Sequence, residues 1–257
     1  MNKTQCLAAE EVVLDTKYNI LRILTTILSI IVIVLLLQIV WFYKTKTVKL
    51  HTNLIILIGN VLYLYAIYVL SLMIEAVVVL FTYTNPCDCL TQVWLVYVIR
   101  IPCFLYFFGS PLFHLAITIE RVLATVYVKI YENQGKFFGV ISTIIVWLLN
   151  LIFGLYLYIT SQMDIDTFSH PMVYIILTTN YNSQILMYLH YFSLFLVISI
   201  AIVDYYLIRR NQKIKLNFFN STTNYSLSKS YQSKQNILLM KIIFPLDFFL
   251  FFCFWII

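Results

Sequence analysis

Electrical charge is what this sequence has least of. Charged residues make up 11% of its 257 residues and hydrophobic ones 62%, with a mean hydropathy of +0.89. A soluble domain typically carries about 25% charged residues. This composition therefore excludes a soluble globular domain and places most of the chain in lipid.

Glycine, proline and cysteine are scarce as well, at five residues each. So few turn-forming residues exclude the short strands and turns of a membrane β-barrel and favour long helices. No Cys-x-x-Cys, His-x-x-x-His or Gly-x-Ser-x-Gly motif occurs, which leaves no zinc site, disulfide scaffold or nucleophile cluster. We expect no catalytic residue, no metal site and no cofactor, and we expect the protein not to be an enzyme.

Long apolar runs are what the sequence does contain. A run of about 20 residues crosses the ~30 Å hydrocarbon core of a bilayer. Such runs cover about residues 20–43, 54–81, 93–118, 138–159 and 185–208, and a shorter one covers 242–257. The pattern predicts an all-α membrane protein, a seven-transmembrane-type helix bundle with five full spans, a truncated sixth and no seventh in this chain. Residues 1–19 are too polar for a signal peptide.

The distribution of basic residues predicts the orientation. The loops after spans one, three and five hold thirteen of the seventeen Lys and Arg, and the loops after spans two and four hold none. By the positive-inside rule, residues 1–19 are extracellular and the loop 209–241 is cytoplasmic. The net charge of +6 is thus a topology signal, and no nucleic-acid partner is expected. Asn2 lies in an exofacial glycosylation sequon, whereas the sequons at Asn220 and Asn224 should stay unmodified inside.

The third span ends in the adjacent pair Glu120-Arg121, for which two interpretations stay open. As an anchor, the pair stops the helix at the headgroups and Arg121 snorkels to them. As a switch, the arginine holds a closed state beside the carboxylate and changes partner when neighbouring helices move. Asp204 and Asp247 add charge to the same cytoplasmic layer. They either pair with nearby basic residues or form a latch between spans three, five and six.

A second group of polar and aromatic residues lies on the expected outer side. Glu75 and Arg100 are at similar depth, and they either pair structurally or belong to the mouth of a ligand pocket. The candidates for this mouth are Glu75, Tyr83, Trp94, Tyr97, Arg100 and Tyr106. The cysteines expected outside are Cys6, Cys87 and Cys89. Their odd number leaves the pairing of an exofacial disulfide open.

The end of the third span resembles the third-helix signature of nematode serpentine chemoreceptors. The run 117–125 reads Ile-Thr-Ile-Glu-Arg-Val-Leu-Ala-Thr, and Tyr131-Glu132 and Gly135-Lys136 follow it. The match is to the Sra-like superfamily, with its alpha, beta, alpha-beta and epsilon classes, which shows Glu-Arg-x-x-Ala before Tyr-Glu. The residues of this chain that carry the pattern are Glu120, Arg121, Ala124, Tyr131 and Glu132, with His114-Leu115-Ala116 and Arg100-Ile101-Pro102 upstream. The resemblance is concentrated in residues 87–140.

This resemblance implies a G-protein-coupled receptor for small environmental chemicals, in the plasma membrane of ciliated sensory neurons. Glu120-Arg121 would stand where the Asp-Arg-Tyr motif stands in better-known receptors. Arg121 would contact a heterotrimeric G protein in the active state, and the loop 209–241 would form part of the docking surface. The resemblance favours the switch interpretation of the pair.

Three departures from the receptor pattern qualify this hypothesis. The loop between spans four and five has no cysteine, so the usual bridge to span three cannot form; the sixth span is short and a seventh is absent; and Asn60, not Asp, is the polar residue inside span two. The alternatives are a truncated, non-signalling receptor product and a small transporter or channel. A transporter would be expected to show inverted repeats or broken half-helices, and the sequence has no repeat.

Overall fold

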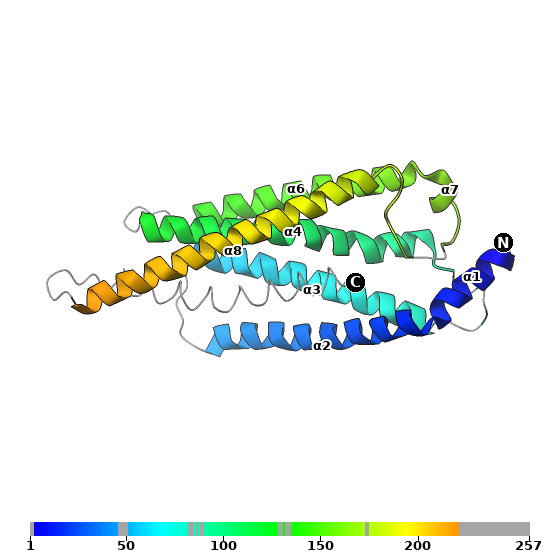
Figure 1. Cartoon of the computed structure of the whole chain (residues 1–257), viewed down its shortest axis with the longest axis horizontal. Coiled ribbons are helices and arrows are strands. Elements are labelled where there is room, and N and C mark those ends of the chain that lie inside the picture. Colours follow the sequence, from blue (N-terminus) through cyan, green and yellow to red (C-terminus); the bar gives the residue numbers. More distant parts are fainter. Residues whose placement is uncertain are drawn as a thin grey trace. The chain divides into compact units, whose positions relative to one another are not determined.

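The structure, a computed structural model, describes residues 3–45, 51–81, 85, 87, 90–127, 131, 135–172 and 175–220. Helices follow one another along this part of the chain (Figure 1). They are α1 (Lys3–Leu14), α2 (Thr16–Thr45), α3 (Thr52–Phe81), α4 (Val93–Val126), α6 (Phe137–Gln162), α7 (Ile165–Phe168) and α8 (Ser183–Asn220). Among the described residues, Thr91 and Met172 form an isolated antiparallel β-bridge.

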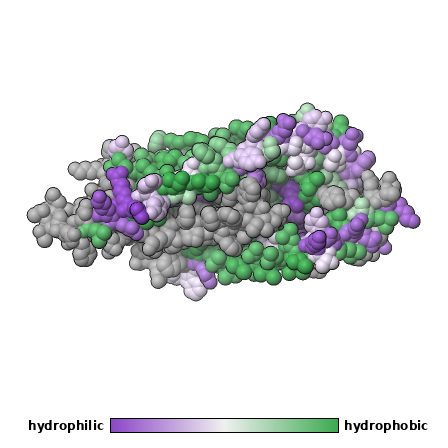
Figure 2. Space-filling model, viewed as in Figure 1, coloured by the Kyte–Doolittle hydropathy of each residue, from purple (hydrophilic) through white to green (hydrophobic). Residues whose placement is uncertain are grey.

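Five of these helices are long and apolar enough to cross a membrane. The apolar stretches are Thr16–Trp41, Thr52–Val78, Val93–Val126, Phe137–Gln162 and Ser183–Lys213. On the face shown in Figure 2, hydrophobic side chains cover the long helices and hydrophilic ones gather toward helix ends. The predicted all-α membrane fold is confirmed, and the five helices are consistent with a seven-transmembrane-type bundle. The predicted span 242–257 lies outside the described residues.

The fifth helix extends beyond the predicted membrane span. That span is expected to end at Arg209-Arg210, and α8 continues as a helix to Asn220. The basic pair limits the apolar stretch without ending the helix. Residues 209–220 contain no Gly or Pro, and their Arg, Lys, Gln and Leu residues are good helix formers.

The N-terminal segment is helical as well. After α1, the side chain of Asp15 accepts hydrogen bonds from the backbone N–H groups of Lys17, at 2.7 Å, and Tyr18, at 3.4 Å. A carboxylate in this place satisfies N–H groups that the first turn of α2 leaves without helical partners. The cap explains why α2 begins at Thr16, within the polar segment 1–19.

The chain divides into two compact units. The first consists of Met1–Val48, Val61–Ser110 and Val146–Tyr191, and the second of Lys49–Asn60, Pro111–Ile145 and Phe192–Ile257. A buried apolar cluster forms the core of the first unit, made of Val96, Phe153, Leu157, Phe168, Met172 and Leu177. In the second unit the buried residues include Leu54, Leu57 and Phe113, together with the charged pair of α4.

The loop between α6 and α8 is fixed within the first unit. Thr91 and Met172 exchange two backbone hydrogen bonds, of 2.9 and 2.8 Å, which tie this loop to the residues just before α4. At the other end of the loop, the side chain of the fully buried Asn182 accepts a hydrogen bond from the Thr179 N–H at 2.8 Å. The same side chain donates a hydrogen bond to the carbonyl of Leu177 at 3.1 Å. Backbone pairing thus fastens a loop that has no cysteine.

Candidate functional site

The Glu120-Arg121 pair near the end of α4 is buried within the second unit. Glu120 is 0% and Arg121 2% exposed. Arg121 donates from Nε and Nη2 to the two carboxylate oxygens of Glu120, a two-point ion pair. An anchor would leave the guanidinium at the headgroups, whereas here protein surrounds it. Both charges therefore depend on each other and on their polar neighbours.

The neighbouring polar group is the hydroxyl of Tyr131, a residue that lies beyond the end of α4 and is 2% exposed. The hydroxyl donates to Glu120 Oε1 and accepts from Arg121 Nη2 at 3.4 Å. His51, just before α3, places Nδ1 2.8 Å from the same hydroxyl, with the two ring centroids 4.3 Å apart. We call His51, Glu120, Arg121 and Tyr131 the inner cluster.

The proton on His51 decides how the inner cluster is connected. A tyrosine hydroxyl carries one hydrogen, so when Glu120 accepts it, Nδ1 has to be the donor in the contact with Tyr131. The backbone N–H of Asn53 also approaches Nδ1, at 3.4 Å, and needs a lone pair there. The two contacts are alternatives, of which the contact with Tyr131 is the shorter. Burial, and secondly the charge of Arg121, lower the pKa of His51, which favours the neutral ring.

A close approach of α6 to α3 positions His51. Gly139 donates its backbone N–H to Asn53 Oδ1 at 3.0 Å, and a Cβ on Gly139 would lie 2.8 Å from both the Cα and the carbonyl oxygen of Asn53. Only glycine lets the two backbones come so near. Because Asn53 follows His51 by two residues, this contact holds the start of α3 beside the inner cluster.

Other predicted switch and latch residues fall around the inner cluster or outside the described residues. Ala124 is buried, and Thr118 donates to Asp204 Oδ1 at 3.0 Å, joining α4 to α8 within the second unit. The structure thus gives Asp204 a partner across two helices. Glu132 and Asp247 lie outside the described residues.

The described pocket-mouth candidates make separate contacts within the first unit. Glu75 and Arg100 pair at 3.0 Å, and Arg100 Nε also donates to the carbonyl of Ile175 in the loop before α8. The Tyr97 hydroxyl accepts from Ser161 and Gln162 of α6, at 3.0 Å each. Tyr106 is buried and stacks on Tyr68 with centroids 4.3 Å apart, whereas Trp94 is 65% exposed. Tyr83 lies outside the described residues.

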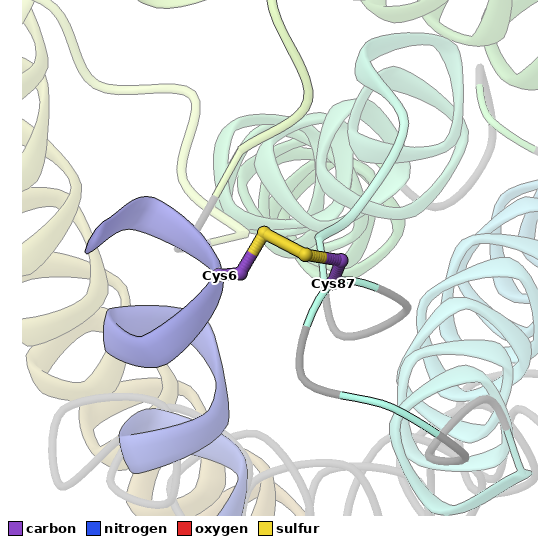
Figure 3. The surroundings of a disulfide bond; sticks show 2 residues. All are labelled: Cys6 and Cys87. Atoms are coloured by element: carbon purple, nitrogen blue, oxygen red, sulfur yellow. A yellow bond between two sulfur atoms is a disulfide. The ribbon is translucent and has the colours of Figure 1, made fainter. Parts of the chain in front are cut away.

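A disulfide joins two of the three candidate cysteines. Cys6 of α1 is bonded to Cys87, which follows α3 (Figure 3). Cys6, Ala9 and Leu90 form a small buried cluster around the bond. Cys89 and the sequon residue Asn2 lie outside the described residues, and Cys103 is a free, buried cysteine.

Sequence reasoning missed the contribution of His51, Asn53 and Gly139 to the inner cluster. No motif marks them, since His51 and Tyr131 are 80 residues apart. Among the described residues, no group of three or more His, Cys, Asp or Glu is placed to hold a metal ion.

Comparison with known proteins identifies the family. A family described as serpentine type 7TM GPCR receptor class ab chemoreceptor matches residues 3–256. No curated protein and no solved structure matches the chain. The family match covers nearly the whole sequence and agrees with the long apolar helices. The chain belongs to the class ab chemoreceptors, a family of serpentine seven-transmembrane G-protein-coupled receptors.

Proposed function

We propose that this protein detects a small environmental chemical and signals to a cytoplasmic heterotrimeric G protein, with the inner cluster as its switch. The observation that carries the proposal is the burial of Glu120 and Arg121, at 0% and 2% exposure, in a two-point ion pair. Family membership supplies the receptor role. We infer the sites of ligand binding and of G-protein coupling from these residues.

Charge is costly to bury without a partner. A buried ion pair that loses one partner costs about 3–5 kcal/mol, because the remaining charge is left uncompensated. Arg121 therefore leaves Glu120 only when another anion or water replaces the carboxylate. Movement of α3 or α4 would separate His51 and Tyr131 from the pair and open it. A G protein that offers new partners to Arg121 would then select the open state.

The proposed orientation places the N-terminus outside the cell and the inner cluster on the cytoplasmic side. The basic loops support it through the positive-inside rule. The Cys6–Cys87 disulfide supports it independently, because disulfides persist in oxidising compartments and are rare in the cytosol. The protein would lie in the plasma membrane as a multi-pass receptor, in sensory cilia by its family resemblance.

The ligand end of the proposed receptor lies in the first unit. Arg100 connects Glu75 of α3 with the backbone of Ile175 in the loop before α8. A ligand that displaces either partner would change how α3 and the loop are held against α4. Because α4 carries both Arg100 and the Glu120-Arg121 pair, a shift of this helix is the proposed route from ligand to switch.

The test uses ligand-independent signalling, since the ligand is unknown. The full chain with an N-terminal epitope is expressed in cultured cells, and second-messenger output is measured at matched surface staining. Glu120→Gln should raise basal output and Arg121→Ala should abolish it. Lys136→Gln, an exposed charge removed from the same unit, is the control. Unchanged output from Arg121→Ala would contradict the proposal.

A further inference from the structure

The helix α8 has two opposite faces between Ser193 and Lys213. Residues on one side are buried, with Ser193 at 2%, Ile200 at 8%, Leu207 at 6% and Asn211 at 3% exposure. Spacings of four and seven residues place these four on one stripe of the helix. All of them belong to the second unit, so this stripe is the side of α8 that packs against protein.

The opposite stripe is exposed and changes its chemistry along the helix. Phe195, Ile198, Ile202 and Tyr205 recur every three or four residues, each at least half exposed. Arg209 and Lys213 continue the same stripe and are exposed too. In a membrane helix, an apolar face followed by tyrosine and then by basic residues marks the passage from hydrocarbon to headgroups. The basic residues therefore face the lipids that surround the apolar part of the stripe.

The Tyr205 ring holds the positive charge of Arg209 in place, and residues 205–220 supply no negative charge to neutralise it. The guanidinium carbon of Arg209 lies 4.8 Å from the centroid of the Tyr205 ring, a cation–π contact that keeps the charge at the level of the tyrosine. Residues 205–220 contain no acidic residue. The nearest one along the chain, Asp204, accepts a hydrogen bond from Thr118 of α4.

We propose that Tyr205, Arg209 and Lys213 form a binding site for anionic phospholipid headgroups of the inner leaflet. Arg offers a planar set of donors that matches a phosphate, and Lys adds a point charge one turn further. The first basic residues after the fifth span thus bind lipid, on the side of α8 opposite its buried stripe. Removal of each basic residue at such a surface should weaken binding about fivefold. The proposal does not depend on G-protein signalling.

The experiment is native mass spectrometry of the full chain in detergent, titrated with phosphatidylinositol 4,5-bisphosphate, phosphatidylserine or phosphatidylcholine. The test variant is Arg209→Gln with Lys213→Gln. Its matched control is Lys3→Gln with Lys17→Gln, which removes two exposed charges on the proposed outer side. A third variant, Arg209→Lys with Lys213→Arg, keeps the charge and guards against misfolding of the neutral form. Soluble inositol trisphosphate tests whether the site takes the free phosphate instead of the lipid.

The proposal predicts that the wild type retains both anionic lipids in preference to phosphatidylcholine. The test variant should bind them about 25-fold more weakly, at two basic residues and about fivefold each, while the control and the charge-keeping variant bind like the wild type. Equal retention by test variant and wild type would overturn the site. Equal loss in the control, or saturation by inositol trisphosphate at the same concentration as by the lipid, would overturn it too.

Discussion

Replacing Tyr131 with phenylalanine tests whether the inner cluster holds the receptor closed. The change removes one oxygen that contacts Glu120, Arg121 and His51, and it keeps the ring that packs on the imidazole. A hydrogen bond to a charged group contributes about 1.5–3 kcal/mol. If the closed state alone makes these contacts, its loss of stability raises the open-to-closed ratio about 10- to 150-fold. A receptor that is about 1% open at rest would become at least about 10% open.

The assay is basal second-messenger output in cells, normalised to surface epitope. Tyr127→Phe is the matched control, because Tyr127 is 54% exposed and loses the same hydroxyl four residues earlier. Output from Tyr131→Phe should rise severalfold, and output from the control should stay at the wild-type level. Wild-type output from Tyr131→Phe at equal surface density would refute the idea that this hydroxyl stabilises the closed state.

Two further predictions concern pH and packing. The closed state lowers the pKa of His51 from its ordinary 6.5. Neutral His51 therefore stabilises the closed state above about pH 6.5, and this stabilisation is lost as the pH falls. Acidifying the cytosol from pH 7.2 to 6.2 should raise basal output in the wild type and not in His51→Phe. A Cβ on Gly109 would lie 2.4 Å from Asn150 Nδ2, so Gly109→Ala should lower the unfolding temperature in detergent, and Asn150→Ala should restore it. Gly139→Ala should lower it without rescue by Asn53→Ala, because the clash there is with backbone; rescue at both glycines, or at neither, would contradict this distinction.

Hydropathy predicted much of this fold because the bilayer imposes a length on each apolar run. The Glu120-Arg121 pair could be singled out for the same reason, since two charges end a long span. The contact of His51 with Tyr131 could not, because it joins residues 80 apart through the packing of α3 and α6. The Glu75–Arg100 pair was foreseen only as one alternative, since equal depth does not determine which helices are neighbours.

Two other features depend on information that the sequence pattern does not carry. Three candidate cysteines allow several pairings, and the burial of α1 beside Leu90 determines that Cys6 meets Cys87. The helix α8 extends past the predicted span end at Arg209, because charge limits how far a helix enters lipid, whereas backbone propensity limits how far it continues in water.

The most direct test of the switch is nucleotide exchange on a purified heterotrimeric G protein by the full chain reconstituted in vesicles. Wild type, Glu120→Gln and the double variant Glu120→Gln with Arg121→Ala would be compared at equal receptor density. We predict that Glu120→Gln accelerates exchange above the wild type and that the double variant returns it to the rate of empty vesicles. Exchange by the double variant as fast as by Glu120→Gln would contradict a role for Arg121 in coupling.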